Sequence, residues 1–453
     1  MEINTAIVAG TGKSGISATK LLVNHGVKVY LFDENKDRDI EAIKEKTGDS
    51  ELVQIELGEL GEDALLSSQL MVISPGIPVD APFTDVVRNA GIPIWSEIEL
   101  AYHYGKGKIA AITGTNGKTT TTALVGEIVK AHNAKTIVVG NIGIPYTELC
   151  DTTDDDSDTV AEISSFQLET VIDFHPNVSA ILNLTPDHLN RHYTFENYGN
   201  VKFSITKNQT MDDVTVLNYD DEHTRAMGEK AKDHCHVVYF SRLEKPAGGV
   251  YVEDGDIILE DGDKKINVLA IKDLKLMGAH NVENVLAAVG ISYYMGVPVD
   301  VIRDVATSFK AVAHRIEYVD TIDGVAYYND SKGTNPDAAI KGIQAMVAPT
   351  FLIGGGYDKG SEYDEWIEAF DGKVKWLVLI GQTAQKIADC AKRHGFNSII
   401  FEENLQDAVA YCHENAVDGD AVLLSPACAS WGQFDNYEQR GDMFKEYVRS
   451  YKE

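Results

Sequence analysis

Short apolar runs alternate along this 453-residue chain with amphipathic segments of helical period. The pattern opens with an apolar strand at Thr5–Ala9, a glycine-rich turn, an amphipathic helix to about His25 and a second strand at Val27–Phe32. A strand, a helix and a strand in this order predict a βαβ unit. The pattern starts afresh at Lys108–Thr113 and again near Val325–Tyr328.

Repeated alternation of strands and helices favours parallel sheets that helices cover on both faces. One stretch, Gly248–Val268, alternates instead around two Asp-Gly-Asp turns and predicts an inserted β-hairpin region. Joins between domains are expected at Ser96–Gly107 and Ser308–Arg315. The predicted fold class is α/β with three domains: an N-terminal Rossmann-like domain over residues 1–100, a central P-loop ATPase-like domain with a parallel sheet over residues 101–312, and a C-terminal Rossmann-like α/β domain over residues 313–453.

Composition narrows the classes of partner. The formal net charge is −30, and such a surface repels phosphate backbones, so we expect no nucleic-acid partner. The five cysteines form no C-x-x-C pair, which is typical of a reducing compartment. We expect no signal peptide, because the N-terminus lacks a basic region, and no membrane span, because no apolar run is long enough. These features together predict a cytoplasmic protein.

The sharpest local motif is the segment G-T-N-G-K-T-T, which follows an apolar strand and precedes a helix. Glycines let the backbone N–H groups face anionic oxygens, and the helix N-terminus adds partial positive charge. Lys118 is positioned to reach the outer phosphates, and the Thr119 hydroxyl to hold Mg²⁺. We therefore predict ATP binding by Gly114, Thr115, Asn116, Gly117, Lys118, Thr119 and Thr120.

A second glycine-rich turn near the N-terminus matches G-x-G-x-x-G and ends at Gly15. Asp33 follows at the spacing of a ribose-binding acid, so the fingerprint taken alone indicates NAD. The downstream phosphate loop favours instead a UDP-type ligand here, with a dinucleotide or a structural turn as alternatives. The turn at Ser74 and Gly76 follows another apolar strand, where ligands of open sheets bind.

Polar residues also follow strands in the middle of the chain. Glu162 and His188 lie at two strand ends in the same domain as the phosphate loop, so they can converge on a metal beside ATP. His188 and His192 are four residues apart, but no third zinc ligand stands out. Lys202 lies in a predicted helix over Phe195–Asn208, where a lysine is by default a surface residue.

Three further segments combine polar side chains with helix starts. Asn281 precedes an Ala-rich helix, which it could cap, or it could bind a base edge. Asn329–Pro336 places a carboxylate, an ammonium and hydroxyls in one loop, and Asn335 is suited to cap the next helix. Ser425–Trp431 supplies small residues that let a ligand approach the backbone.

These motifs, in this order and over essentially the whole chain, resemble the Mur ligases of peptidoglycan synthesis. The most specific segment is S-P-A-C-A-S with the aromatic residues and Arg440 beyond it, which resembles the D-glutamate-adding branch of the family. The resemblance implies an ATP-dependent amide ligase that joins D-glutamate to UDP-N-acetylmuramoyl-L-alanine through an acyl phosphate. It also implies Mg²⁺ at two sites and a monomer.

The resemblance implies roles for individual residues. The UDP-substrate is expected at Gly15, Asp33, Ser74, Gly76, Asn141 and Ser165. Lys118, Glu162, His188 and Lys202 are expected at the catalytic centre, with Thr119, Glu162, His188 and a carbamylated Lys202 as metal ligands. Asn281, Arg315 and Asp330 are expected to contact the nucleotide, and Lys332, Thr334, Lys359, Ser430 and Tyr437 the incoming amino acid.

Three alternatives remain from the sequence. The first is another amide ligase of the same superfamily, such as the L-alanine- or diamino-acid-adding enzyme or a folylpolyglutamate synthase. The second is an NAD-dependent oxidoreductase, which leaves the ATP loop unexplained. The third is a nucleotide-regulated binding protein without turnover, which would bind ATP but release no ADP in response to substrate.

Overall fold

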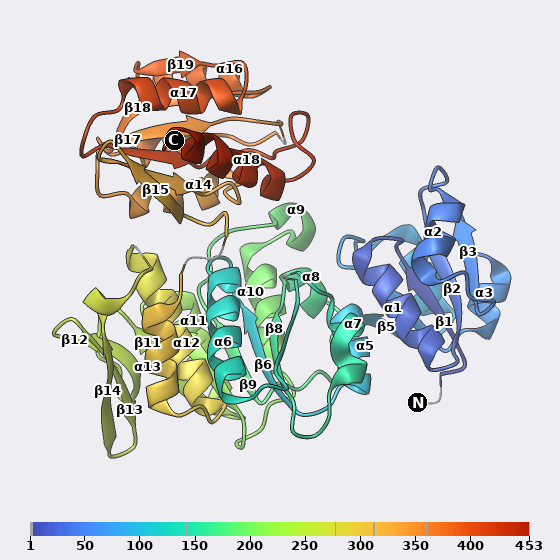
Figure 1. Ribbon diagram of the computed structural model, residues 1–453. Helices are drawn as coiled ribbons and strands as arrows, with labels where there is room; N and C mark the ends of the chain where they lie inside the picture. Colours follow the sequence, from blue (N-terminus) through green and yellow to red (C-terminus); the bar gives the residue numbers. More distant parts are fainter. Residues whose placement is uncertain (1–2, 142, 277, 311–312, 359, 453) are drawn as a thin grey trace. The chain divides into compact units, whose positions relative to one another are not determined.

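The computed structural model describes residues 3–141, 143–276, 278–310, 313–358 and 360–452. Within these residues the strands form three sheets, each with helices beside it (Figure 1). Internal contacts divide the chain into two compact units. One comprises residues 1–273 and 283–307, and the other comprises residues 274–282 and 308–453.

The N-terminal sheet is parallel throughout, in the order β3-β2-β1-β4-β5. Alternate residues of β1 face two separate cores: Ala6 and Val8 pack on the α1 side, whereas Ile7 and Ala9 pack against residues of α3 and α4. This confirms the prediction of a doubly covered sheet. The elements are β1 (Thr5–Ala9), α1 (Lys13–Asn24), β2 (Lys28–Asp33), α2 (Ile40–Thr47), β3 (Val53–Leu57), α3 (Glu62–Ser67), β4 (Leu70–Ile73), α4 (Pro82–Asn89) and β5 (Ile94–Ser96).

The middle sheet has the order β14-β13-β12-β11-β10-β9-β6-β8-β7. The strands from β7 to β12 pair in parallel, and β12, β13 and β14 form an antiparallel meander at one edge, which confirms the predicted hairpin region. Its strands are β6 (Lys108–Thr113), β7 (Ile137–Gly140), β8 (Asp158–Glu162), β9 (Val178–Ile181), β10 (Val214–Asn218), β11 (His236–Ser241), β12 (Gly249–Glu253), β13 (Asp256–Asp261) and β14 (Lys264–Ala270). Its helices are α6 (Lys118–His132), α7 (Tyr146–Leu149), α8 (Ser165–Leu168), α9 (Leu189–His192), α10 (Phe195–Phe203), α11 (Glu222–Ala231), α12 (Ala279–Tyr294) and α13 (Val299–Ser308).

The C-terminal sheet has the order β15-β16-β20-β17-β18-β19. It is parallel except for β15, which pairs antiparallel with β16; this edge strand was not predicted from the sequence. Leu352 and Leu423 face one core, and Phe351 and Val422 face the other. The elements are β15 (Glu317–Ile322), β16 (Val325–Asn329), α14 (Pro336–Ala345), β17 (Thr350–Gly354), α15 (Asp364–Glu368), β18 (Val374–Leu379), α16 (Ala384–Arg393), β19 (Ile399–Phe401), α17 (Leu405–Asn415), β20 (Ala421–Leu424) and α18 (Tyr437–Ser450).

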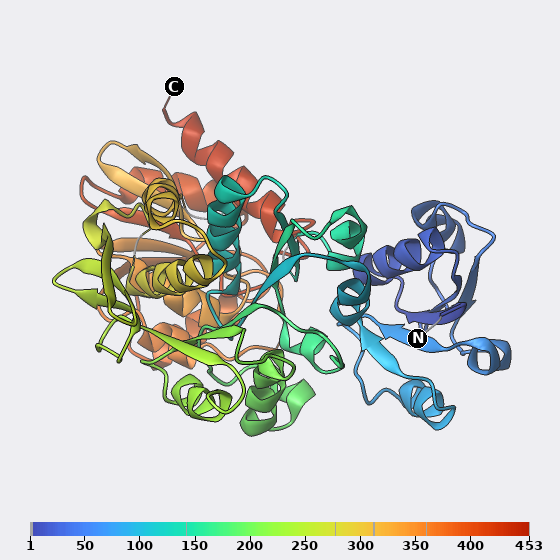
Figure 2. The same cartoon turned by 90° about the horizontal axis from the view of Figure 1, so that it is seen from below.

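Helix α5 (Glu97–Tyr104) occupies the first predicted join and turns two buried carboxylates into the protein. Glu97 accepts hydrogen bonds from the backbone N–H and hydroxyl of Thr147 at 2.6 and 2.9 Å. Glu99 accepts from three backbone N–H groups at 2.7–3.0 Å, those of Ile172, Asp173 and Phe174. Helix α7, which carries Thr147, also packs against α1 (Figure 2). The buried carboxylates therefore fix α5 to the middle sheet's loops.

None of the helices in the described part of the chain is both long and apolar enough to cross a membrane.

Replacing Glu99 by Ala is expected to lower the free energy of unfolding by about 3 kcal/mol, because three backbone N–H groups, one of them buried, would lose their acceptor and the buried side chain would leave a cavity. Urea denaturation of the full chain measures this. Exposed Glu127 on α6 offers the matched control, and Glu127→Ala should change stability by less than about 0.5 kcal/mol. Equal effects of the two substitutions would contradict the role assigned to Glu99.

Candidate active site

The loop between β6 and α6 is curled as a phosphate-binding loop requires. Gly114 and Gly117 adopt φ values of +145° and +83°, which residues with a Cβ rarely adopt. A Cβ on Gly117 would lie 2.2 Å from Oδ1 of Asn284, so the side chain of Asn284 closes directly over the loop. Lys118 and Thr119 open the helix, which places them at its partially positive end.

Asn183, which follows β9, clamps this loop from the neighbouring strand. Its Oδ1 accepts from the Asn116 backbone N–H at 2.8 Å, and its Nδ2 donates to the Asn116 carbonyl at 3.1 Å. Its own carbonyl accepts from the Thr115 N–H at 3.1 Å. Neither Asn183 nor Asn284 was predicted to have a role. The sequence pattern that could have identified Asn183 is its place shortly after an apolar strand, because such a strand can pair with β6.

Two lysines converge on a single oxygen of the loop. The ammonium nitrogens of Lys118 and Lys202 each lie 2.9 Å from the carbonyl oxygen of Gly114. Lys202 is 1% exposed, and its nitrogen lies 4.7 Å from the ring centre of Tyr198. Burial lowers the pKa of Lys202 well below its ordinary value, and the charge of Lys118 lowers it further, against smaller opposing effects of Asp187 and Glu162. Lys202 is therefore disposed to be an uncharged amine, and the default prediction of a surface lysine is wrong.

Glu162 ends β8 beside β6 and is 2% exposed. Its Oε1 accepts a 2.7 Å hydrogen bond from Nδ2 of Asn141. Its Oε2 is buried and accepts no hydrogen bond from any residue that the structure describes. A buried carboxylate oxygen with unused lone pairs is costly unless a cation or donor approaches it. Glu162 therefore fits a hard divalent cation such as Mg²⁺.

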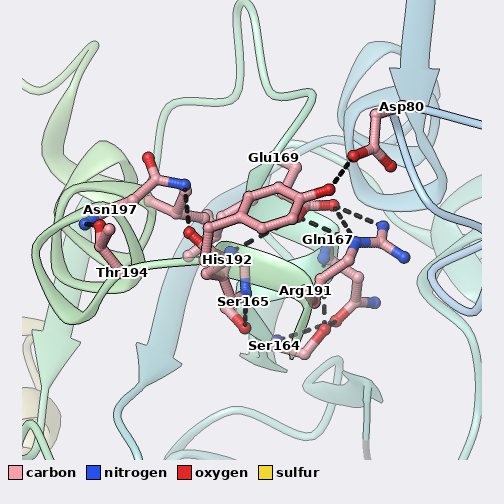
Figure 3. Close-up of polar contacts among 12 residues, drawn as sticks. Asp80, Ser164, Ser165, Gln167, Glu169, Arg191, His192, Thr194 and Asn197 are labelled. Carbon is pink, nitrogen blue, oxygen red and sulfur yellow. Dashed lines mark hydrogen bonds and ion pairs between the residues drawn. The ribbon is translucent and has the colours of Figure 1, made fainter. Parts of the chain in front are cut away.

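Polar contacts hold the side chains of Arg191 and His192, at the end of α9, in place (Figure 3). Arg191 pairs with Glu169 at 2.6 Å, and Nε2 of His192 lies 3.0 Å from Oγ of Ser165. Burial lowers the pKa of His192 to about 4, so this ring is neutral. His188 adopts φ +52°, and its imidazole is 48% exposed. His192 thus has a structural environment, whereas His188 is half exposed and its Nε2 lies 3.4 Å from Oδ2 of Asp187.

The same segment contacts the turn after β4. Arg191 donates to the carbonyl of Ile77 at 2.7 Å, and the Tyr193 hydroxyl donates to Asp80 (Figure 3). The turn itself is closed by a 3.0 Å bond from the Ile77 N–H to the Ser74 carbonyl, with Gly76 inside it. Two predicted sites, the Ser74–Gly76 turn and the His188 segment, are therefore physically linked within one compact unit.

The N-terminal glycine turn requires glycine at position 15, because a Cβ there would lie 1.8 Å from the Gly10 carbonyl oxygen. The Oγ of Ser74 points at this turn and is buried without a hydrogen bond from the described residues. Asp33 accepts from the Thr11 hydroxyl at 2.6 Å and from its N–H at 3.1 Å. Burial acts to raise the pKa of Asp33, but these bonds and one from Asn35 outweigh it and lower the pKa. Asp33 thus fixes the turn.

A cavity of about 610 Å³ opens from this turn along α1 towards α7. Its lining combines three lysines, the two carboxylates of Glu148 and Asp151, and small polar and apolar side chains, and its volume suits a ligand of nucleotide size. It includes Thr11, Gly12, Lys13, Ile16, Ser17, Lys20, Lys46, Thr147 and Thr152.

In the other unit, Asp330 lies just beyond β16 and is almost completely buried. Its Oδ2 accepts from the Ser425 hydroxyl at 2.7 Å, and its Oδ1 accepts from the Ile316 N–H at 3.3 Å. Burial raises the pKa of Asp330 to about 7, against the opposing hydrogen bond from Ser425 and the charge of Arg315. Nε of Arg315 is buried and has no hydrogen-bond partner in the described part of the chain.

Asn281 lies inside α12 rather than before it, so the interpretation of Asn281 as the cap of that helix is wrong.

Arg440 joins the two polar loops of this unit. It is 1% exposed and donates to Oγ and the carbonyl of Ser331 at 2.9 and 2.8 Å. It also donates to the carbonyl of Cys428 at 3.2 Å. Sequence analysis noted Arg440 only as part of a pattern, because a donor that bridges residues 331 and 428 cannot be read from local spacing.

Several of the residues predicted to bind the amino acid lie near Arg440 and the two loops that it joins. Nζ of Lys332 lies 5.5 Å from the ring centre of Tyr437, and the Tyr437 carbonyl accepts from Ser331 at 2.8 Å. Ser430 is buried, and Thr334 follows Lys332 in the same loop. Asn335 caps α14 as predicted. Lys359 lies outside the described residues.

Comparison with known proteins covers the whole chain. Three family models match: Mur ligase MurD-like, N-terminal domain, at residues 4–96; Mur ligase middle domain at residues 112–292; and Mur ligase, glutamate ligase domain, at residues 314–428. A UDP-N-acetylmuramoylalanine--D-glutamate ligase of Lachnospira eligens is 55% identical over 450 residues, which cover 99% of each chain. Further relatives between 43% and 51% identity carry the same name.

Solved structures share the fold. UDP-N-acetylmuramate-alanine ligase MurC from Thermotoga maritima gives a TM-score of 0.61 at 19% identity, covering 99% of this chain and 100% of that one. A MurF ligase from Thermotoga maritima, solved in complex with ADP, gives 0.56 at 17% identity, covering 86% and 91%. At these identities the likeness establishes the three-part α/β fold.

Asp330 should make stability depend on pH. Its folded pKa of about 7 exceeds the ordinary value of 3.8, so between these pH values the folded state holds a proton that the unfolded state has released. Stability should therefore fall as pH rises through this window, by at most about 4 kcal/mol for one group. Urea denaturation at pH 5 and pH 8 should show a smaller fall for Asp330→Asn than for wild type. Asp371→Asn, an exposed control, should retain the wild-type fall; an equal fall in all three proteins would contradict the assignment.

Proposed function

This chain belongs to the Mur ligase family, and from that premise we propose that it joins D-glutamate to UDP-N-acetylmuramoyl-L-alanine, releasing ADP and phosphate. The product would be a precursor of cell-wall peptidoglycan. One structural observation supports the proposed chemistry most directly. The phosphate loop, a buried Lys202 of lowered pKa and the unsatisfied Glu162 oxygen lie together at one edge of the middle sheet.

ATP would bind through Gly114, Thr115, Asn116, Gly117, Lys118, Thr119 and Thr120. The positive-φ glycines and the Asn183 clamp support this, because they hold the loop in an anion-binding shape before any ligand arrives. Lys118 would transfer its hydrogen bonds from the loop carbonyls to phosphate oxygens. Asn281, Arg315 and Asp330 would also contact the nucleotide, and Nε of Arg315, which has no hydrogen-bond partner among the described residues, suits an anionic group.

Mg²⁺ would be held by Thr119, Glu162, His188 and Lys202, at two sites. The buried Glu162 oxygen and the accessible His188 ring fit this requirement. Bound there, Mg²⁺ would offset the charge that develops on transferring phosphoryl oxygens.

Lys202 can serve a cation only if its own charge is removed. Its neutral amine would attack CO₂, form a C–N bond and lose a proton to solvent, giving a carbamate that bears a negative charge. The lowered pKa supports this step, because only the uncharged amine has the lone pair that reacts.

The reaction itself needs no protein nucleophile. A carboxylate oxygen of the UDP-linked substrate would attack the γ-phosphorus of ATP, and ADP would leave. The D-glutamate amine would then add to the carbon of the acyl phosphate, lose a proton and expel phosphate as the amide forms. Lys118 would stabilise the negative charge on the transferring group.

The two substrates would be bound by different parts of the chain. The UDP portion would bind at Gly15, Asp33, Ser74 and Gly76 and in the adjoining cavity, where Lys13, Lys20 and Lys46 could meet its phosphates. Asn141 and Ser165 would face its sugar–peptide end; the bond from Asn141 to Glu162 supports a place beside a proposed metal ligand, and Ser165 contacts His192 at the end of α9. Lys332, Thr334, Lys359, Ser430 and Tyr437 would surround D-glutamate.

We further propose the domain limits 1–100, 101–312 and 313–453, a monomeric state and a cytoplasmic location.

ADP release tests the proposal directly. Purified protein would receive ATP, Mg²⁺ and UDP-N-acetylmuramoyl-L-alanine, with D-glutamate, L-glutamate, L-alanine or a diamino acid in parallel. Release is expected with D-glutamate alone. Release with another amino acid would move the chain within the family, and ATP binding without release in any reaction would overturn the enzymatic proposal.

Lys118→Ala should reduce the rate of ADP release by at least about 10²-fold, because one preorganised cation at the phosphoryl group would be lost. Exposed Lys130 on the same helix supplies the matched control, and Lys130→Ala should retain the wild-type rate. Near-normal turnover by Lys118→Ala would contradict the phosphate-loop assignment.

A further inference from the structure

A cluster of metal-binding side chains lies outside the proposed active site, on the packed pair of helices α15 and α16. Asp364 opens α15, Cys390 lies in the last turn of α16, and His394 caps that helix. One ligand atom from each of the three lies within 4.8 Å of the others. Tetrahedral zinc sites with such ligands separate the donor atoms by about 3.3–3.6 Å, so small side-chain rotations would suffice.

The hydrogen-bond pattern already orients the imidazole. Nε2 of His394 lies 2.8 Å from Oδ1 of Asp364, and Nδ1 lies 3.7 Å from Oε1 of Glu368 on the next turn of α15. A ligating histidine commonly donates its second N–H to a carboxylate, which fixes the ring and raises its basicity. Glu368 is placed for that supporting role.

The environment suits entry of an ion from solution. The side chain of Cys390 is buried, whereas those of Asp364 and His394 are 44% and 26% exposed. Arg393 also lies 3.4 Å from Asp364, but its side chain is 60% exposed and can turn into water. A cation would replace the proton between Asp364 and His394 and displace the thiol proton of Cys390 to solvent.

The described residues include a second cluster of this kind, formed by Glu99, His103 and Asp173. It differs in how its buried carboxylate is already hydrogen-bonded. The Glu99 carboxylate is already saturated by three backbone N–H groups. In the Asp364 cluster no backbone N–H bond to the carboxylate is recorded among the residues described, and the bonds that it accepts come from side chains that a cation can replace.

We propose that Asp364, Cys390 and His394 bind one thiophilic divalent cation of the Zn²⁺ class. Thiolate and imidazole donors favour such an ion over Mg²⁺, so this site is chemically distinct from the Glu162 centre. The ion would tie α15 to α16 directly after the loop that follows β17. That loop ends at Tyr363, whose hydroxyl contacts the sulfur of Cys428. The bound cation would therefore stabilise one side of the proposed amino-acid site.

Cobalt substitution tests the site without relying on activity. Untagged full-length protein, stripped of metal with a chelator, would be titrated with Co²⁺. Wild type is expected to bind Co²⁺ with a near-ultraviolet thiolate-to-cobalt band that saturates at one equivalent and is abolished by Zn²⁺. Cys390→Ser should lose the band, and His394→Gln and Glu368→Gln should weaken Co²⁺ binding by about 10-fold or more.

Three controls separate this result from other causes. Cys412→Ala, a buried cysteine of the same unit outside the cluster, should keep the band, and so should His188→Ala, which removes a proposed Mg²⁺ ligand. Circular dichroism would verify folding, and Asp364→Asn, at a half-exposed position, provides a second variant if Cys390→Ser fails to fold. Absence of the band in wild type, or its persistence in folded Cys390→Ser, would overturn the proposal whatever the outcome of the ADP-release assay.

Discussion

The carbonyl oxygen of Gly114 accepts hydrogen bonds from two lysine side chains, and this shared contact constrains the rest of the centre. Two ammonium groups cannot approach one another in a buried site without a large electrostatic cost. Lys118 begins a helix next to solvent-accessible loop atoms, whereas Lys202 is almost wholly enclosed. The cost therefore falls on Lys202, which is disposed to be uncharged. An uncharged buried amine beside a carboxylate and a phosphate loop has little structural value, but it can be converted into a metal ligand.

The topology of the middle sheet brings these groups together. Strand β6 lies between β8 and β9, and all three run parallel, so their carboxyl ends meet at one edge. Gly114 follows β6, Glu162 is the last residue of β8 and Asn183 follows β9, so the phosphate loop, a carboxylate and the amide that holds the loop lie at the same edge. Ligand sites of open parallel sheets occur at this edge for the same reason.

Much of this arrangement could be predicted from local sequence. The phosphate loop, the strand-end residues Glu162 and His188, and the alternation of strands and helices all have signals within a few residues. Asn183 and Arg440 were missed because they act through partners that lie elsewhere in the fold, Asn183 through a loop 67 residues away in the chain. Strand β15 is a different kind of miss, because it pairs with the next strand, β16, across the short turn at Asp323–Gly324. The burial of Lys202 was equally invisible, because a lysine on a short helix looks the same in sequence whether that helix faces solvent or the sheet.

The proposal that Lys202 is carbamylated is tested most directly by carbon-13 NMR of protein equilibrated with ¹³C-labelled bicarbonate. The account predicts a protein-bound carbamate resonance in wild type that is absent from Lys202→Ala, and ADP release that falls when CO₂ is removed and returns with bicarbonate. Full ADP release in CO₂-depleted buffer, with no carbamate resonance at any bicarbonate concentration, would contradict it.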